Sequence, residues 1–170
     1  MPITRLAHIA FQVRNLDATL RYYCEGLGLR EHFRISFGEL REMMDRDARE
    51  GRPHIVDDRV RAHIDRHPTD PWIVYLEVAP LQYIEVFPAI NPESLGDPLG
   101  ADSHNHLCLE VDDAYAMWEE LSGKGLRADG PPRSGPDNSV QFWLTDPDGH
   151  RLELMQYTAA SLQRTGRLHL

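Results

Sequence analysis

Several features that would assign a protein to a special class are scarce in this sequence. Only two cysteines occur in 170 residues, which is too few for a disulfide framework and favours a reducing compartment. No apolar run approaches the roughly 18 residues that span a bilayer, and the N-terminal segment becomes polar too early for a secretory signal. Basic residues are outnumbered, and the net charge of −9 argues against nucleic acid or an anionic membrane as a partner. We therefore expect a cytoplasmic protein.

The sequence contains an internal repeat that begins with a strand and a helix. In the first half, alternating apolar residues predict a strand over Leu6–Val13 and helical spacing predicts a helix over Ala18–Glu25. In the second half, the same order is predicted by His106–Val111 and Ala114–Lys124. Aligning His8 with His106 brings both segments into register. Such a repeat indicates two copies of one structural unit.

The repeat continues into a pair of strands. Tyr75–Phe87 and Trp143–Met155 each have two apolar segments flanking a tight turn. The turn in the second half, Asp146-Pro147-Asp148-Gly149, has proline and glycine where a chain reversal favours them. The predicted unit is therefore a strand, a helix and further strands, present twice.

The first half carries an insertion of about residues 34–70, which is charged and almost without strand patterns. Helices are predicted over Gly38–Glu50 and Asp57–His67, separated by Gly51-Arg52-Pro53. Long insertions without structure are uncommon in compact domains. Two interpretations remain open, a lid or side element and a solvated amphipathic decoration.

One His or one Glu stands on each of four predicted strands, opposite the apolar face. Residues two apart share a face of a strand, so His8 lies opposite Ile9 and Phe11. The four residues in this position are His8, Glu85, His106 and Glu153. They occupy equivalent places in the two repeats, and packing with pseudo-twofold symmetry would bring them together. Two carboxylates and two imidazoles would be costly to desolvate in one cavity unless a divalent cation neutralised them. Imidazole and carboxylate suit Ni, Co, Zn, Mn or Fe, so we predict one such ion.

At these residues the sequence resembles the vicinal oxygen chelate superfamily, which includes glyoxalase I, fosfomycin-resistance enzymes and extradiol dioxygenases. The resemblance rests on HIAFQV around His8, QYIEVF around Glu85, HNHLCLEV around His106 and DPDGHRLELMQ around Glu153, with LRYYCEGLGLRE between the first two. It implies an α+β fold of two tandem βαβββ modules, whose curved mixed sheets surround a metal site. The implied domains are a first module over 1–92 with its helical insertion at 34–70, a second module over 93–157 and a tail over 158–170.

The ligand set is closest to that of glyoxalase I. The resemblance implies a metal-dependent isomerase, epimerase or lyase that moves a proton next to a carbonyl of a small oxygenated metabolite, through a metal-bound enediolate. Glu153 or Glu85 would be the catalytic base, with a slight preference for Glu153. The alternatives are an extradiol-type dioxygenase, an epoxide-opening enzyme of the fosfomycin-resistance type and a binding protein without activity.

Four further residues are candidate substrate contacts on the same strand faces: Gln12, Tyr83, Phe87 and Trp143. Relatives that act on glutathione adducts commonly carry a basic residue where this chain has Gln12, so we expect a substrate other than the glutathione hemithioacetal. Relatives also often dimerise and some exchange modules between subunits. We therefore expect a homodimer with a small-molecule substrate.

Overall fold

The computed structural model describes residues 4–96 and 105–166. The chain divides into two compact units, Met1–Leu95 and Gly96–Leu170, and each is described by itself. Among the helices of the described residues, none is both long and apolar enough to span a bilayer.

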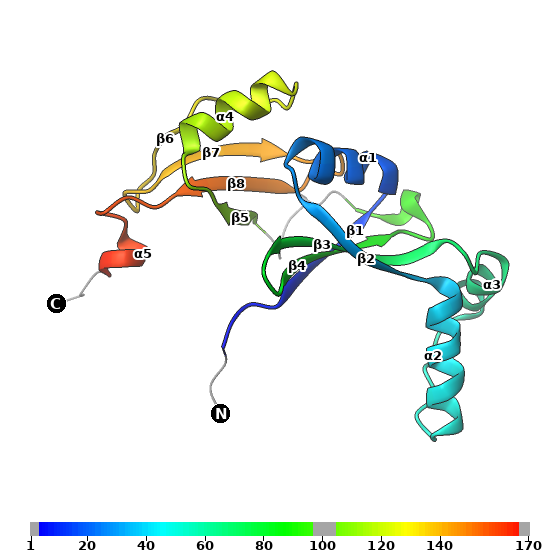
Figure 1. Cartoon of the computed structure of the whole chain (residues 1–170). Coiled ribbons are helices and arrows are strands. Elements are labelled where there is room, and N and C mark those ends of the chain that lie inside the picture. Colours follow the sequence, from blue (N-terminus) through cyan, green and yellow to red (C-terminus); the bar gives the residue numbers. More distant parts are fainter. Residues whose placement is uncertain (1–3, 97–104, 167–170) are drawn as a thin grey trace. The chain divides into compact units, whose positions relative to one another are not determined.

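The first unit holds a four-stranded mixed sheet in the order β1-β4-β3-β2. Its elements are β1 (His8–Val13), α1 (Leu16–Leu20), the π-helical turn η1 (Arg21–Gly26), β2 (Arg30–Ser36), α2 (Phe37–Arg49), α3 (Asp58–Arg66), β3 (Pro71–Ala79), β4 (Gln82–Pro88) and the 3₁₀ turn η2 (Pro92–Ser94). β1 runs parallel to β4, and the other pairs are antiparallel. Figure 1 shows α2 and α3 at one end of this sheet.

The second unit repeats the sheet in the order β5-β8-β7-β6. Its elements are β5 (Leu107–Glu110), α4 (Ala114–Gly123), β6 (Arg133–Ser134), β7 (Val140–Thr145), β8 (Arg151–Gln156) and α5 (Leu162–Thr165). α4 packs against β7 and β8 (Figure 1). The strand order, and the parallel pairing of the first and last strands, are the same as in the first unit. The predicted α+β fold of two βαβββ modules is confirmed.

Equivalent capping residues begin the helix of each module. Asn15 accepts a hydrogen bond from the backbone N–H of Ala18, and Asp113 accepts from those of Tyr115 and Ala116. Both side chains satisfy N–H groups that have no partner within the helix, which explains why each helix starts where it does. Gly28 and Gly125 adopt φ values of 80° and 82° after these helices, in the left-handed region that glycine tolerates best.

The insertion forms two helices with a small core of their own. Ser36 and Glu39 form a capping box at the start of α2, and Asp57 caps α3. Phe37, Leu40, Met44 and Ile64 are buried together, and Trp72 packs against them. This packing favours the side-element interpretation over a solvated decoration. The helices begin later than residue 34, because Arg34–Ser36 continue β2 and pair with β3.

The hairpins of the two modules differ near their turns but share one register at the candidate ligands. In the second module β7 and β8 pair without interruption, so Trp143 lies opposite Glu153. In the first module an irregularity between Glu77 and Ala79 shifts the pairing of β3 with β4 by one residue, and Tyr75 lies opposite Glu85. Tyr75 and Trp143 therefore hold equivalent positions, each directly across from the candidate ligand of its module.

Candidate metal centre

In the first module the structure brings His8 and Glu85 together. Their strands are parallel neighbours, and Glu85 pairs in register with Ala10, two residues after His8. The distance from His8 Nδ1 to Glu85 Oε1 is 3.5 Å. The Glu85 side chain is 9% exposed, whereas that of His8 is 51% exposed. A nearly buried carboxylate therefore faces an accessible imidazole.

The second module holds the same arrangement. Glu153 pairs with Cys108, two residues after His106. His106 Nε2 lies 3.2 Å from Glu153 Oε2, and the Glu153 side chain is again 9% exposed. The two pairs therefore occupy equivalent register positions in the two modules, as the repeat in the sequence predicts.

The surroundings of Glu85 are aromatic. The hydroxyl group of Tyr75 donates a hydrogen bond to Glu85, and burial together with this bond raises the pKa of Tyr75 to about 12. Tyr75 stacks on Phe33 with ring centroids 4.1 Å apart, and Tyr83 lies at its edge with centroids 5.8 Å apart. His32 lies 5.3 Å from Tyr83 between ring centroids. Glu85 thus projects from a sheet face covered by rings.

The surroundings of Glu153 are mixed. Cys108 lies beside it, and burial, followed by the negative charge of Glu153, raises the pKa of the thiol to about 12. Trp143 meets the ring of His106 edge-on at 4.8 Å between centroids, and the Arg151 guanidinium lies 5.1 Å from the Trp143 centroid. Trp143 therefore packs between the candidate ligand His106 and the positively charged side chain of Arg151.

The donor chemistry of both pairs fits a divalent transition metal. Imidazole nitrogen and carboxylate oxygen are the ligands that Zn, Ni, Co, Mn and Fe accept. A cation would also relieve the cost of holding a carboxylate among apolar strands. Within the described residues, no group of three or more His, Cys, Asp or Glu side chains is placed to hold a metal ion. Each module by itself supplies two donors, and the four-ligand site stays a prediction.

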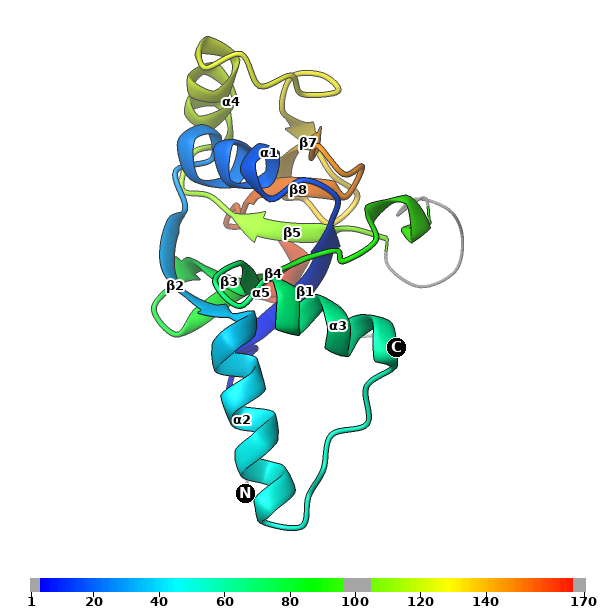
Figure 2. The ribbon, with the colours of Figure 1, turned by 90° about the vertical axis from the view of Figure 1, so that its right-hand side faces the viewer.

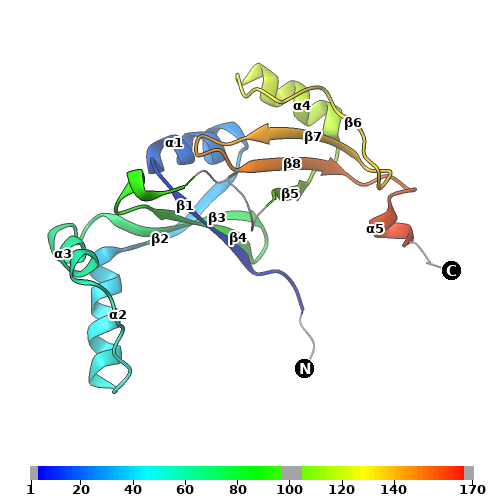
Figure 3. The same cartoon turned by 180° about the vertical axis from the view of Figure 1, so that it is seen from behind.

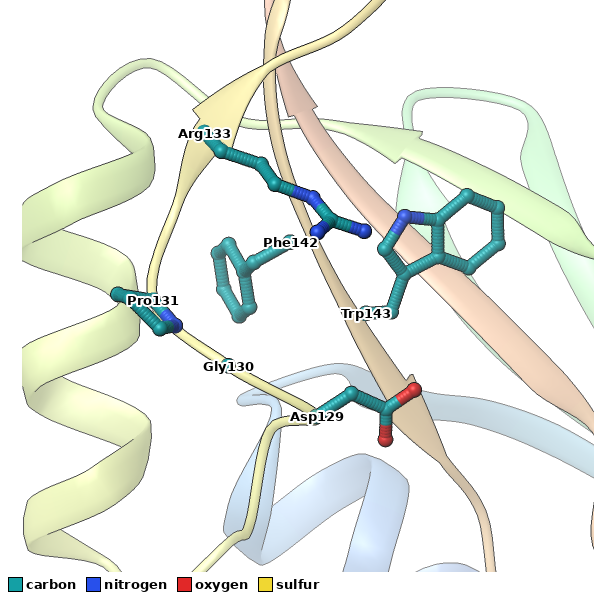
Figure 4. A pocket seen from close by; sticks show the side chains of 6 residues that line it. All are labelled: Asp129, Gly130, Pro131, Arg133, Phe142 and Trp143. Carbon is teal, nitrogen blue, oxygen red and sulfur yellow. The ribbon is translucent and has the colours of Figure 1, made fainter.

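The four predicted substrate contacts lie in three settings. Gln12 and Phe87 line a cavity of about 480 Å³ in the first module, and Tyr83 belongs to the aromatic group beside Glu85. Trp143 lines a cavity of about 210 Å³ in the second module. There the Arg133 guanidinium points toward the space between the Phe142 and Trp143 rings (Figure 4). Their roles as substrate contacts stay predictions.

Tyr75 and Trp72 were not among the residues singled out from the sequence. Tyr75 lies opposite Glu85 as Trp143 lies opposite Glu153, so the alignment of Tyr75–Phe87 with Trp143–Met155 is the signal that could have found it. Trp72 lies at the start of β3 and packs both on the insertion core and on Phe87. The signal for Trp72 in the sequence is its place as an aromatic residue two positions after the insertion.

Comparison with known proteins identifies the family. A profile of the Glyoxalase/Bleomycin resistance protein/Dioxygenase superfamily matches residues 5–154. The chain belongs to this superfamily, which is the vicinal oxygen chelate superfamily named above. It is 34% identical over 58 residues to the lactoylglutathione lyase of Neisseria meningitidis serogroup A. That match covers 32% of this chain and 41% of the relative, so the chain spans less than half of the relative's length.

Solved structures share the fold over nearly the whole chain. A glyoxalase family protein from Enterococcus faecalis superposes with a TM-score of 0.62 at 19% identity, covering 89% of this chain and 97% of that one. The lactoylglutathione lyase from Agrobacterium tumefaciens gives a TM-score of 0.57 at 16% identity, over 92% of this chain and 96% of that one. At such identities the likeness concerns the fold alone.

Proposed function

We propose that this protein is a metal-dependent isomerase, epimerase or lyase that moves a proton next to a carbonyl of a small oxygenated metabolite. The observation that carries the proposal is the pair of equivalent His–Glu contacts, 3.5 Å in the first module and 3.2 Å in the second. Membership of the superfamily and the partial similarity to a lactoylglutathione lyase support the same chemistry.

His8, Glu85, His106 and Glu153 would hold the ion. When bound, a divalent cation acts as a Lewis acid that stabilises negative charge developing on substrate oxygens. The chain's own contribution is proton transfer: one carboxylate accepts the proton from the carbon beside the carbonyl and returns it to the neighbouring position. Glu85 is held by the Tyr75 hydroxyl. Glu153 has the Cys108 thiol beside it, a weaker donor than a hydroxyl. Glu153 is therefore the better candidate for the base.

Two measurements on the purified chain test the proposal together. Metal analysis should find close to one divalent ion per chain, and chelation should remove it. Incubation in heavy water with a panel of hydroxy-ketones, and with the hemithioacetal of glutathione and methylglyoxal, should introduce deuterium beside the carbonyl of at least one compound. The proposal also expects the glutathione adduct to be a poor member of the panel, because Gln12 offers no positive charge.

The same measurements separate the alternatives. An extradiol-type dioxygenase would contain iron, consume oxygen and introduce no deuterium. An epoxide-opening enzyme would consume an epoxide and add water or a thiol, again without exchange. A preparation that binds no divalent metal at all would contradict the proposal and favour a binding protein.

We also propose that the protein is a homodimer. Light scattering coupled to size-exclusion chromatography measures this directly, since the mass of one chain is 19.5 kDa. A single species at the mass of one chain, over a hundredfold range of concentration, would contradict this part.

A further inference from the structure

The insertion forms one wall of a cavity that lies wholly within the first module. This insertion cavity is about 480 Å³, and its lining includes Gln12 from β1, Phe87 from β4, Trp72 from β3, and Phe37 and Arg59 from the insertion. Figure 2 shows α3 beside the sheet of the first module, and Figure 3 shows α2 and α3 from behind. A volume of this size is typical of sites for small molecules.

The insertion cavity adjoins the His8–Glu85 pair along the sheet. Gln12 pairs with Phe87, and this pair lies two residues further along the strands than the pair of Ala10 and Glu85. Residues two apart on a strand share a face and lie roughly 7 Å from one another. A small molecule whose reactive end lies at Glu85 can therefore place its other end against Phe87.

The walls of the insertion cavity are aromatic and well supported. Trp72 and Phe87 meet edge to face with ring centroids 5.7 Å apart. Phe37 is 3% exposed and anchors the insertion core, against which Trp72 also packs. Such walls favour an aromatic or branched alkyl group over a polar one.

One cation of the insertion cavity is available to a ligand. Arg59 lies in the first turn of α3, and its side chain makes no ion pair or hydrogen bond within residues 4–96 and 105–166 of the structure. Asp57, the anion that also lines the cavity, is already used as the helix cap, since its carboxylate accepts from the N–H of Val60 at 2.8 Å. A guanidinium group beside an aromatic wall suits a carboxylate at the end of an apolar group.

We infer that the insertion cavity is a specificity subsite for the distal end of the substrate, an aryl or branched alkyl group that carries a carboxylate. This inference rests on the proposed function, because it assigns the reactive end of the same molecule to Glu85. The insertion thereby selects substrates by their distal end, which is not involved in proton transfer. Gln12 supplies an amide that can accept or donate a hydrogen bond at the junction of the two ends.

The test uses 3-phenylpropionate as the probe and the full-length chain in the presence of a chelator. Binding is followed by nuclear magnetic resonance through the indole N–H of Trp72, assigned by its loss in Trp72→Phe. We expect this resonance to shift on titration, and Arg59→Gln to weaken binding about fivefold, as expected for loss of a partly exposed ion pair. The uncharged probe 3-phenyl-1-propanol should bind the wild type and Arg59→Gln equally.

The matched control is Arg61→Gln, which removes the same charge from the same helix at an exposed position that does not line the cavity. It should bind 3-phenylpropionate like the wild type. An unmoved Trp72 indole, or equal weakening by both arginine variants, would overturn the inference. Because no metal is present in this test, failure of the proposed function would leave probe binding intact and would be seen instead in the metal analysis and deuterium exchange.

Discussion

The two modules share one frame but surround their carboxylates differently. Ile84 and Leu152, each fully buried, precede Glu85 and Glu153 on equivalent strands. Around that frame the first module places Ala10 and Tyr75 beside its carboxylate, whereas the second places Cys108 and Trp143. The duplication therefore preserves the candidate ligands, while the neighbours that decide how firmly each carboxylate is held have diverged.

The modules also differ in what has been added to them. The first carries the insertion, which begins at the end of β2 and builds its own core. The second is followed by a tail whose short helix α5 is tied to the turn before β7 (Figure 3), since the N–H of Leu162 donates to the carbonyl oxygen of Asp137 at 2.8 Å. One addition enlarges the surface near a candidate ligand, and the other braces a hairpin.

The largest expected effect separates the two carboxylates. With metal supplied in excess, Glu153→Gln should reduce deuterium exchange at the substrate carbon about 10²-fold to 10⁴-fold, the usual contribution of a general base. Glu85→Gln should reduce it less, because the Tyr75 hydroxyl holds Glu85 in place, whereas Glu153 has only the weaker Cys108 donor beside it. Exchange rates followed by mass spectrometry give both values. If both variants exchange at the wild-type rate, neither carboxylate is the base; the reverse order would assign the base to Glu85.

A smaller effect, on metal affinity, tests the residues opposite the two carboxylates, Tyr75 and Trp143. Tyr75→Phe removes only the hydroxyl that donates to Glu85, and groups that orient a ligand typically contribute about tenfold or more to metal affinity. Trp143→Phe, the matched change opposite Glu153, removes no donor to the carboxylate and keeps an aromatic ring beside His106, so it should lower metal affinity less. Competition with a chromophoric chelator measures both affinities. Equal losses in the two variants would contradict the difference drawn between the modules.

Much of this frame could be predicted from the sequence, because burial of one strand face imposes an alternating pattern. Ile9, Phe11 and Val13 are less exposed than His8, Ala10 and Gln12 between them, so the strand and its outward-facing His were predictable. The two helices of the insertion were also predictable, because the segment is charged, almost without strand patterns and interrupted by Gly51-Arg52-Pro53. These are local signals, carried by residues that are close together in the chain.

Irregularities of a hairpin and contacts that depend on tertiary packing could not be predicted in this way. The repeat aligns Tyr75 with Trp143, so the pairing of Tyr75 with Glu85 could be predicted, whereas the irregularity between Glu77 and Ala79 could not. The residue types around Val78 do not predict this irregularity in the pairing. The insertion cavity likewise requires Arg59 and Phe87 to line one space, and 27 residues of chain lie between them.

The N-caps of the two module helices can be compared through the free energy of unfolding, which each changes by about 1 kcal/mol. Asn15→Ala and Asp113→Ala should each lower the free energy of unfolding by about 1 kcal/mol, as loss of an N-cap generally does. The second loss should be the larger, because Asp113 accepts from two N–H groups and its charge also favours the positive end of the helix. Urea denaturation measures the difference. Asp112→Ala, at the exposed neighbouring position, should change little, and a loss equal to that of Asp113→Ala would remove the cap as the cause.

The smallest effect concerns the bond between Asp137 and the tail of the second module, and how this bond responds to low pH. Hydrogen bonds from the Gln163 side chain and from Ser139 hold the pKa of Asp137 below its usual range. A carboxyl group with a lowered pKa in the folded state stabilises the structure above its unfolded value of about 3.9, and this contribution is lost as the pH falls through the lower folded value. The side-chain amide resonance of Gln163 should therefore titrate with a midpoint below pH 3.9. Asp137→Asn should abolish that titration, whereas Asp112→Asn should leave it in place. A midpoint at or above the unfolded value would show that Asp137 does not anchor α5, and the brace would then depend on the backbone bond from Leu162 and on the contacts of Asn138 with Thr158 and Ser161.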